Sequence, residues 1–185
     1  MIIKEKNFII LNRPEKKNAM NRPLVDAFLK ALDEEEKSRS NYVIIKGAGC
    51  TFCSGADLKE DLEVVVPAIK TLFDRLKVFP KPIISYVEGY CLAGGMGLIA
   101  LSDLVYSHPH AIFGLPEIKK DIVPAMVYDL LKPILNPRHL NELAYLGEFI
   151  DAKRAFEIGL INHISDIPEP IDTVTLKKIK ALNFK

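Results

Sequence analysis

Three glycines within four positions begin an apolar, helix-like stretch in the middle of this chain. Residues 91–103 read C-L-A-G-G-M-G-L-I-A-L-S-D, with Gly94, Gly95 and Gly97 where the apolar pattern starts. Each glycine inside a helix costs roughly 1 kcal/mol relative to alanine, so a compensating use is expected. Two uses compete: binding a phosphate, or stabilising another developing anion through main-chain N–H groups.

The residues after the glycines weigh against the phosphate alternative. A phosphate loop requires a lysine and a serine or threonine directly after its glycines, whereas Leu98 and Ile99 follow Gly97. A dinucleotide fingerprint requires G-x-G-x-x-G, and A-G-G-M-G lacks the third glycine. A Walker-type site is therefore excluded and the dinucleotide signal is weak. What remains is an oxyanion site, in which N–H groups from two strand-to-helix turns point at one oxygen.

A second turn of small residues supplies the partner that such a site needs. F-C-S-G-A-D occupies residues 52–57, after a predicted strand at 42–46, and L-A-G-G-M occupies residues 92–96, after a predicted strand at 83–87. For one glycine run alone, tight helix packing is the commoner use. The paired occurrence favours an oxyanion site built from both turns, because each permits close backbone approach to a ligand.

Length and charge limit the classes of protein to consider. A chain of 185 residues suits one compact domain, and 25 Lys and Arg residues against 24 Asp and Glu give a formal net charge of +1. That balance gives no reason to expect nucleic acid or an anionic membrane as a partner. The N-terminal residues lack a signal peptide's apolar core, and no apolar stretch approaches the roughly 20 residues of a membrane span. The sequence predicts a cytoplasmic protein.

Strand patterns alternate with helix patterns along the chain, which predicts an α/β fold. Predicted strands are 8–11, 42–46, 83–87, 104–107, 111–113 and 160–164, and predicted helices are one capped by Asn21, 60–79, one after the glycine run, 125–135, 140–146 and 151–158. Pro67 is expected to kink or split the helix at 60–79. The acidic run at 33–36 is expected to be a solvated helix face.

The cysteines and histidines give little support for a metal or redox site. Cys50 and Cys53 form a C-x-x-C pair, which could be redox-active or half of a zinc site, but no second Cys or His pair stands at zinc spacing. His108 and His110 flank Pro109 without a third ligand. No metal is therefore predicted, and a redox role for Cys50 and Cys53 is left open.

Five segments, taken in order, resemble the motif set of the crotonase, or enoyl-CoA hydratase/isomerase, superfamily. They are N-R-P-E-K-K-N-A-M (12–20), F-C-S-G-A-D-L-K-E (52–60), K-P-I-I-S-Y-V-E-G-Y-C-L-A-G-G-M-G-L (81–98), F-G-L-P-E-I (113–118) and A-F-E-I-G-L-I-N-H-I (155–164). The resemblance covers residues 8–164 and implies a spiral ββα fold that lacks most of the family's C-terminal helical region. It predicts a core domain at 1–164 and a tail at 165–185 with one helix capped by Asp172.

The resemblance also implies an acyl-CoA thioester as substrate, with the thioester oxygen held by two backbone N–H groups. Carried over position by position, these belong to Ala56 and Gly94, and such donors supply about 3 to 4 kcal/mol each of transition-state stabilisation. The residues implied in substrate and CoA binding are Lys16, Lys17, Ala56, Asp57, Leu58, Lys59 and Gly94. Coenzyme A enters as part of the substrate, so no separate cofactor is expected.

Of the two glutamates used by the family's hydratases, one is present as Glu117, whereas Gly97 occupies the position of the other. Hydration needs one group to activate water and another to deliver a proton, so a single carboxylate suits it poorly. Shifting a double bond between the β,γ and α,β positions needs one base. The sequence therefore predicts an enoyl-CoA isomerase first, with a hydratase, a CoA-thioester hydrolase and a non-catalytic acyl-CoA-binding subunit as alternatives. Asp121 is a candidate second acid.

The resemblance bears on assembly as well. Family members continue well beyond the position of Ile164 with helices that cover the site and join a trimer, and this chain reaches only Lys185. A homo-oligomer of the family's trimer or hexamer type is expected, although the short C-terminus puts that assembly and the lid over the acyl pocket in question.

Overall fold

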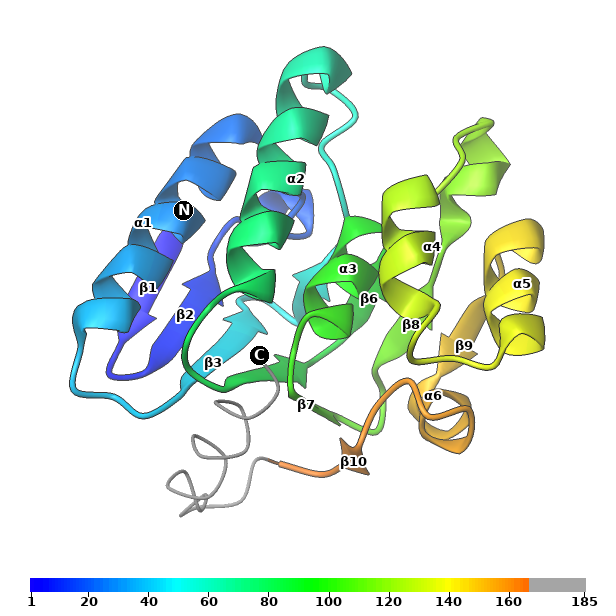
Figure 1. The fold of residues 1–185 in the computed structure, drawn as a ribbon. Helices are drawn as coiled ribbons and strands as arrows, with labels where there is room; N and C mark the ends of the chain where they lie inside the picture. The colour runs from blue at the N-terminus through cyan, green and yellow to red at the C-terminus, as the bar shows by residue number, and fades with distance from the viewer. Residues whose placement is uncertain (167–185) are drawn as a thin grey trace.

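A computed structural model of the chain describes residues 1–166, which form two sheets covered by helices (Figure 1). The tail helix expected after Asp172 lies outside the described residues, as does most of the tail predicted at 165–185. In the part of the chain that the structure describes, no helix is both long and apolar enough to cross a membrane.

The larger sheet has six strands in the order β1-β2-β3-β5-β7-β10. They are β1 (Ile2–Glu5), β2 (Phe8–Leu11), β3 (Val43–Gly47), β5 (Ile83–Val87), β7 (Leu104–Ser107) and β10 (His163–Ile164). β1 is antiparallel to β2, and the other neighbours pair in parallel. Parallel neighbours need long crossover connections, which accounts for the alternation of strand and helix patterns in the sequence.

The smaller sheet has four strands in the order β4-β6-β8-β9. They are β4 (Thr51–Cys53), β6 (Tyr90–Leu92), β8 (Ile112–Gly114) and β9 (Phe149–Asp151). β4, β6 and β8 follow closely after β3, β5 and β7, so the chain passes three times from the larger sheet to the smaller one and then into a helical segment. This repeat is the spiral ββα arrangement that the sequence resemblance implies.

The helices cover the sheets as the amphipathic patterns predict (Figure 1). They are α1 (Arg22–Lys37), α2 (Leu62–Lys77), α3 (Gly94–Ala100), α4 (Ala125–Leu131), α5 (Pro137–Leu146) and α6 (Ala152–Glu157), with short 3₁₀ helices η1 (Pro14–Lys16) and η2 (Pro116–Lys120). Asn21 caps α1 as predicted, since its side chain accepts a hydrogen bond from Leu24 N at 3.0 Å. α2 continues through Pro67, so the predicted split of this helix does not occur.

Two further expectations from the sequence need correction. Residues 90–92 form strand β6 before the helix begins, whereas the glycine run and its surroundings read as helix from 91 onwards. Glu35, in the acidic run predicted to be solvated, is fully buried. Its Oε2 accepts a hydrogen bond from Ser38 Oγ at 2.8 Å, and its Oε1 lies 3.3 Å from Lys4 Nζ. The Lys4 ammonium compensates the charge of the buried carboxylate, and Oε1 accepts no hydrogen bond among the described residues.

Candidate active site

Three parallel strands of the smaller sheet bring the predicted segments to one edge. β4, β6 and β8 are neighbours that run in the same direction, so their carboxyl ends lie at the same edge of the sheet. The turn at 54–57 follows β4, Ala93 and Gly94 follow β6, and Glu117 lies shortly after β8. Ala93 N donates a hydrogen bond to Gly114 O at 3.0 Å, which ties the second segment to the third.

The turns around Gly55 and Gly94 are in direct contact. A Cβ placed on Gly55 would lie 2.6 Å from Ala93 Cβ and 3.1 Å from Gly94 N, and a Cβ placed on Gly94 would lie 3.3 Å from Gly55 Cα. Gly55 also has φ +96°, which side chains rarely adopt. The close approach of the two turns is therefore the use that offsets the conformational cost of their glycines.

The N–H group of Ala56 is left open by the way its turn is held. Met20 N donates to Gly55 O at 2.7 Å, and Asp57 N donates to Met20 O at 2.9 Å, so that Ala56 sits in a parallel bridge opposite Met20. The main-chain groups of the bracketed residue in such a bridge point away from the partner. Within residues 1–166 the Ala56 N–H has no hydrogen-bond acceptor.

The N–H group of Gly94 is open for a different reason. Gly94 is the first residue of α3, where N–H groups have no intrahelical partner, and the described chain provides no other acceptor for it. Ala93, directly before it, has φ 52° and ψ −121°, a conformation that is strained for a residue with a Cβ. Each of the two adjoining turns therefore has a main-chain N–H group without an acceptor in the described chain, and their joint binding of one oxygen anion stays a prediction.

Glu117 provides a carboxylate at the same edge. It stands in the first turn of η2 and is partly buried, and its Oε2 is buried without a hydrogen-bond partner among the described residues. Burial raises the pKa of Glu117 above its ordinary value. A carboxyl group with a raised pKa and a free oxygen has the properties of a proton-transferring group.

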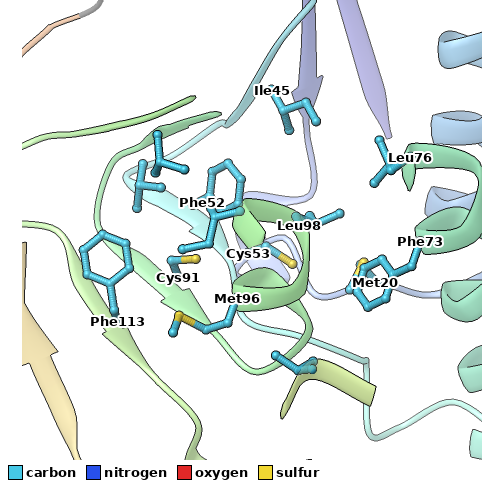
Figure 2. Close-up of a cluster of buried hydrophobic side chains, with 14 of the residues drawn as sticks. Met20, Ile45, Phe52, Cys53, Phe73, Leu76, Cys91, Met96, Leu98 and Phe113 are labelled. Atoms are coloured by element: carbon cyan, nitrogen blue, oxygen red, sulfur yellow. The ribbon is translucent and has the colours of Figure 1, made fainter. Parts of the chain in front are cut away.

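A second carboxylate is absent from position 97, and Phe73 occupies the neighbouring space. A Cβ on Gly97 would lie 2.5 Å from Cζ and 2.7 Å from Cε2 of Phe73, a fully buried ring of α2. Figure 2 shows Phe73 and Met20 on the side of α3 that faces α2. The nearest acidic residue further along the chain, Asp103, accepts a hydrogen bond from Ile83 N at 2.7 Å and so serves strand β5.

Asp57, predicted to contact the substrate, uses its carboxylate inside the protein. Its Oδ2 lies 2.6 Å from Nη1 of Arg13, and its Oδ1 accepts a hydrogen bond from Lys59 N at 3.1 Å. Both members of the ion pair are largely buried, and the hydrogen bond from Arg13 lowers the pKa of Asp57. Arg13 was not singled out from the sequence, although it stands in the N-R-P motif. The pair fixes the turn at 54–57 from outside.

Asn18 is a second buried anchor that sequence reasoning missed. It is fully buried, accepts a hydrogen bond from Arg13 N at 2.8 Å, and donates to Ala48 O at 2.9 Å and Thr51 O at 2.6 Å. An asparagine in a motif with two lysines offers a weak sequence signal, since asparagine also tolerates the left-handed φ of 51° found here.

Four other predicted binding residues are exposed around these turns. They are Lys16, Lys17, Leu58 and Lys59. Lys17 Nζ lies 5.8 Å from the centre of the Tyr90 ring. Asp121, the candidate second acid, is exposed at the end of η2 with φ 56°. Aspartate tolerates this left-handed backbone, and a catalytic role for Asp121 stays a prediction.

The three cysteines are free thiols in contrasting surroundings. Cys50 is exposed, whereas Cys53 and Cys91 are buried as neighbours in the β4–β6 register. Burial raises the pKa of the Cys53 thiol to about 12. A thiol so rarely ionised is a poor nucleophile, which weighs against a redox pair formed with Cys50.

Comparisons with known proteins agree with this geometry. The sequence matches the family described as Enoyl-CoA hydratase/isomerase over residues 7–183. It is 35% identical over 167 residues to the mevalonyl-coenzyme A hydratase of Aspergillus fumigatus, covering 84% of this chain and 61% of the relative. It is 31% identical over 165 residues to the mitochondrial enoyl-CoA hydratase domain-containing protein 2 of Bos taurus, covering 84% and 56%. The chain spans less than two thirds of the length of these relatives.

Solved structures share the fold. An enoyl-CoA hydratase/isomerase from Xanthobacter autotrophicus Py2 superposes with a TM-score of 0.86 at 31% identity, covering 99% of this chain and 78% of that one. An enoyl-CoA hydratase from Thermoplasma volcanium GSS1, at 24% identity, has a TM-score of 0.87 over 99% of this chain and 82% of its own. The predicted crotonase fold is confirmed. With the family match extending over nearly all its residues, the chain belongs to the enoyl-CoA hydratase/isomerase family.

Proposed function

We propose that this chain acts on an acyl-CoA thioester and moves a double bond of an enoyl-CoA between the β,γ and α,β positions. The observation that carries the proposal is the pair of open N–H groups of Ala56 and Gly94 at the same sheet edge as Glu117, whose Oε2 has no partner in the described chain. Such an arrangement suits removal of a proton beside a thioester, because negative charge then develops on the carbonyl oxygen.

The proposed reaction uses Glu117 as both base and acid. Its carboxylate takes a proton from the α-carbon of a 3-enoyl-CoA, and the electron pair moves onto the thioester oxygen, where it is held by the two N–H groups. The protonated carboxyl then returns the proton to the γ-carbon, which leaves the double bond conjugated with the thioester. No net proton is gained or lost. Positioned proton transfer contributes about 10²- to 10⁴-fold, and each oxyanion donor about 10²- to 10³-fold.

The surroundings of Glu117 support this double use. Desolvation raises the pKa of the carboxyl group, which brings its basicity closer to that needed at neutral pH. Because its Oε2 has no partner in the described chain, the oxygen has a free lone pair for a substrate proton. A carboxylate saturated by hydrogen bonds would lack this capacity.

The CoA moiety is assigned to the surface beside the 54–57 turn. Lys16, Lys17 and Lys59 are exposed cations on the two segments that meet there, and each suits a partly solvated phosphate. Leu58, 46% exposed, adds apolar surface directly after the same turn.

A homo-oligomer is part of the proposal as well. Exposed aromatic side chains at Tyr90 and Phe149, with ring centres 6.5 Å apart, support a further packing partner.

A hydratase is the second candidate, because the relatives compared above carry that name. Hydration would require a second acid, and Phe73 lies where a side chain at position 97 would project. Asp121 would then have to supply the second carboxyl group.

One assay separates these reactions. The chain is incubated with a 3-enoyl-CoA and, separately, with a 2-enoyl-CoA, and absorbance of the conjugated enoyl thioester is followed. Gain of conjugation from the first without loss from the second is the expected result. Loss from the second would replace the isomerase by a hydratase, and release of free CoA thiol would indicate a hydrolase. Binding of both without conversion would leave an acyl-CoA-binding subunit.

A further inference from the structure

Met20 contacts both of the turns that carry the open N–H groups. It is fully buried and belongs to the segment that follows η1, far in sequence from either turn. Its main chain meets the first turn and its side chain meets the second.

The main chain of Met20 sets the orientation of the first donor. Its N–H donates to Gly55 O at 2.7 Å and its carbonyl accepts from Asp57 N at 2.9 Å. These two bonds hold the residues before and after Ala56, so the peptide plane that carries the Ala56 N–H cannot rotate independently. If the pairing of Met20 with this turn were shifted by one residue, the Ala56 N–H would point toward the Met20 segment rather than away from it.

The side chain of Met20 supports the second donor. A Cβ on Gly94 would lie 2.6 Å from Met20 Cε, so the methyl group packs against the glycine at the start of α3. Figure 2 shows the Met20 side chain on the face of α3 that also meets Phe73. A flexible, unbranched side chain fits such an irregular gap well.

The segment that presents Met20 is itself held to the first turn. Ser54 N donates to Lys17 O at 3.1 Å, and Arg13 Nη1 binds both Ala19 O at 3.1 Å and the Asp57 carboxylate. Met20 therefore approaches the turns from a fixed support, and a change in its side chain is transmitted to Gly94 rather than absorbed by the segment.

We propose that Met20 is a positioning residue that sets the spacing and direction of the Ala56 and Gly94 N–H groups relative to each other. This inference rests on the proposed function in that the two N–H groups bind the thioester oxygen. Shortening the Met20 side chain removes the support beneath Gly94 and lets the start of α3 shift. A displacement of about 1 Å in a reacting constellation can cost about 10²-fold in rate.

The test compares Met20→Ala, Met20→Leu and Leu32→Ala. Leu32 is fully buried in α1 and outside both turns, so Leu32→Ala controls for a cavity elsewhere in the core. Three quantities are measured: kcat and KM for a 3-enoyl-CoA, the red shift of a bound 2-enoyl-CoA conjugated with an aromatic ring, and the amide NMR shifts of Ala56 and Gly94. The red shift reports polarisation of the thioester carbonyl by hydrogen bonds.

We expect Met20→Ala to lower kcat by about 10- to 100-fold with KM within about threefold, to reduce the red shift, and to move both amide signals. Met20→Leu, which restores most of the side-chain volume, is expected to recover most of the kcat, the red shift and the amide signals. Leu32→Ala is expected to leave the kinetics, the red shift and the two amide signals as in the wild type. Normal kcat and red shift in Met20→Ala would overturn the inference, as would equal losses in Leu32→Ala.

The NMR comparison separates this inference from the proposed function. If the wild-type chain neither converts the 3-enoyl-CoA nor shifts the probe, the proposed function fails. The two amide signals then decide the role of Met20 on their own. Their joint movement in Met20→Ala, but not in Leu32→Ala, supports the coupling of the turns, and unchanged signals would overturn it.

Discussion

Glu35 and Glu117 are both withdrawn from solvent, but their carboxylates meet different surroundings. Glu35, in α1, is fully buried, with Ser38 Oγ at 2.8 Å from one oxygen and Lys4 Nζ at 3.3 Å from the other. Glu117, after β8, keeps a buried Oε2 without a partner in the described chain. Burial by itself therefore does not mark a functional carboxylate. Glu35 Oε1 also accepts no hydrogen bond among the described residues, but the Lys4 ammonium compensates its charge, whereas no ion pair is formed by Glu117 in that part of the chain. A buried carboxylate oxygen with neither a hydrogen bond nor a compensating charge is the better mark, because it costs stability unless another use offsets it.

The elements around the two glutamates differ in the same way. α1 begins at an Asn21 cap with ordinary backbone geometry and packs a regular apolar face. The edge of the smaller sheet holds a strained Ala93, a Gly55 at φ +96° and two open N–H groups. Left-handed backbone occurs elsewhere in the chain as well, but at this edge it coincides with the two open N–H groups, as expected where structure serves chemistry rather than stability.

The largest expected effect comes from exchanging each glutamate for its amide. Glu117→Gln keeps the shape of the side chain but removes the base, so kcat for a 3-enoyl-CoA is expected to fall by about 10²- to 10⁴-fold. Glu35→Gln is the matched control and is expected to change kcat by less than about threefold, because its carboxylate serves only α1 and β1. Steady-state kinetics on both variants measures the difference. Equal losses would mean that neither carboxylate is the base.

The parts of the site that sequence predicted are those with a local signature. The two small-residue turns and Glu117 stand in short motifs, and the apolar runs at 8–11 and 83–87 are observed strands. β6 was missed because its three residues join directly to the glycine run, whose apolar pattern reads as helix. A strand this short has too few residues for its own periodicity to appear.

What the sequence could not predict depends on contacts between distant segments. Arg13 and Asp57 lie 44 positions apart, and neither residue type nor spacing indicates that they pair. The burial of Glu35 likewise depends on Lys4, which belongs to strand β1. The acidic pattern of α1, taken alone, therefore favours an exposed face. The strain at Ala93 has no sequence signature, since alanine ordinarily favours helix.

The second prediction tests whether the two turns must touch. In Gly55→Ala the new Cβ would meet Ala93 Cβ at 2.6 Å and Gly94 N at 3.1 Å, so we expect the turns to separate and kcat to fall by about 10²- to 10³-fold. Gly159→Ala is the matched control. Gly159 has φ +77°, and nothing lies within 4 Å of a Cβ added there. Gly159→Ala therefore introduces the strain of an alanine at positive φ without a steric clash, and the variant should keep full activity. Equal kcat in the two variants would contradict the contact between the turns.

The third prediction concerns the ion pair that fixes the first turn. Arg13→Ala leaves the Asp57 carboxylate largely buried without its partner, which is expected to lower the free energy of unfolding by about 2 to 3 kcal/mol. Lys70→Ala removes the exposed pair with Asp74 on α2 and is expected to cost much less, because solvent screens this pair. Urea denaturation of both variants measures the contrast.

The pH dependence of that pair has a defined sign. Because the pKa of Asp57 is lowered in the folded chain, its contribution is present above the unfolded pKa of about 3.8 and is lost as pH falls through the folded value. The difference in stability between wild type and Arg13→Ala should therefore shrink at low pH. A difference that is constant from pH 7 to pH 3 would contradict a charged pair.

The fourth prediction concerns Glu117, whose pKa is shifted in the direction opposite to that of Asp57. Burial raises its pKa above the ordinary 4.5, so folding favours the protonated form. The contribution of this group to stability is present below pH 4.5 and is lost as pH rises through the folded pKa. Glu117→Gln is therefore expected to unfold at higher urea concentration than wild type at pH 7 and at the same concentration at pH 4. A variant less stable at pH 7 would show that the Glu117 carboxylate is satisfied after all.

The smallest expected effects are changes in stability on substituting the residue that precedes α1 and the residue that precedes α3. Asn21→Ala removes the side-chain acceptor that caps α1 and is expected to cost about 1 kcal/mol. Ala93→Gly before α3 is expected to act in the opposite direction, because glycine adopts φ 52°, ψ −121° without steric strain. Part of the roughly 1 to 3 kcal/mol of relieved strain is offset by the greater freedom of glycine in the unfolded chain, so a gain of about 1 kcal/mol is expected by urea denaturation. If Ala93→Gly is more stable and also keeps kcat within about twofold, the strained backbone of Ala93 is not itself needed for catalysis. If it is more stable but loses kcat, the Cβ of Ala93 is required to hold the Gly94 N–H in place.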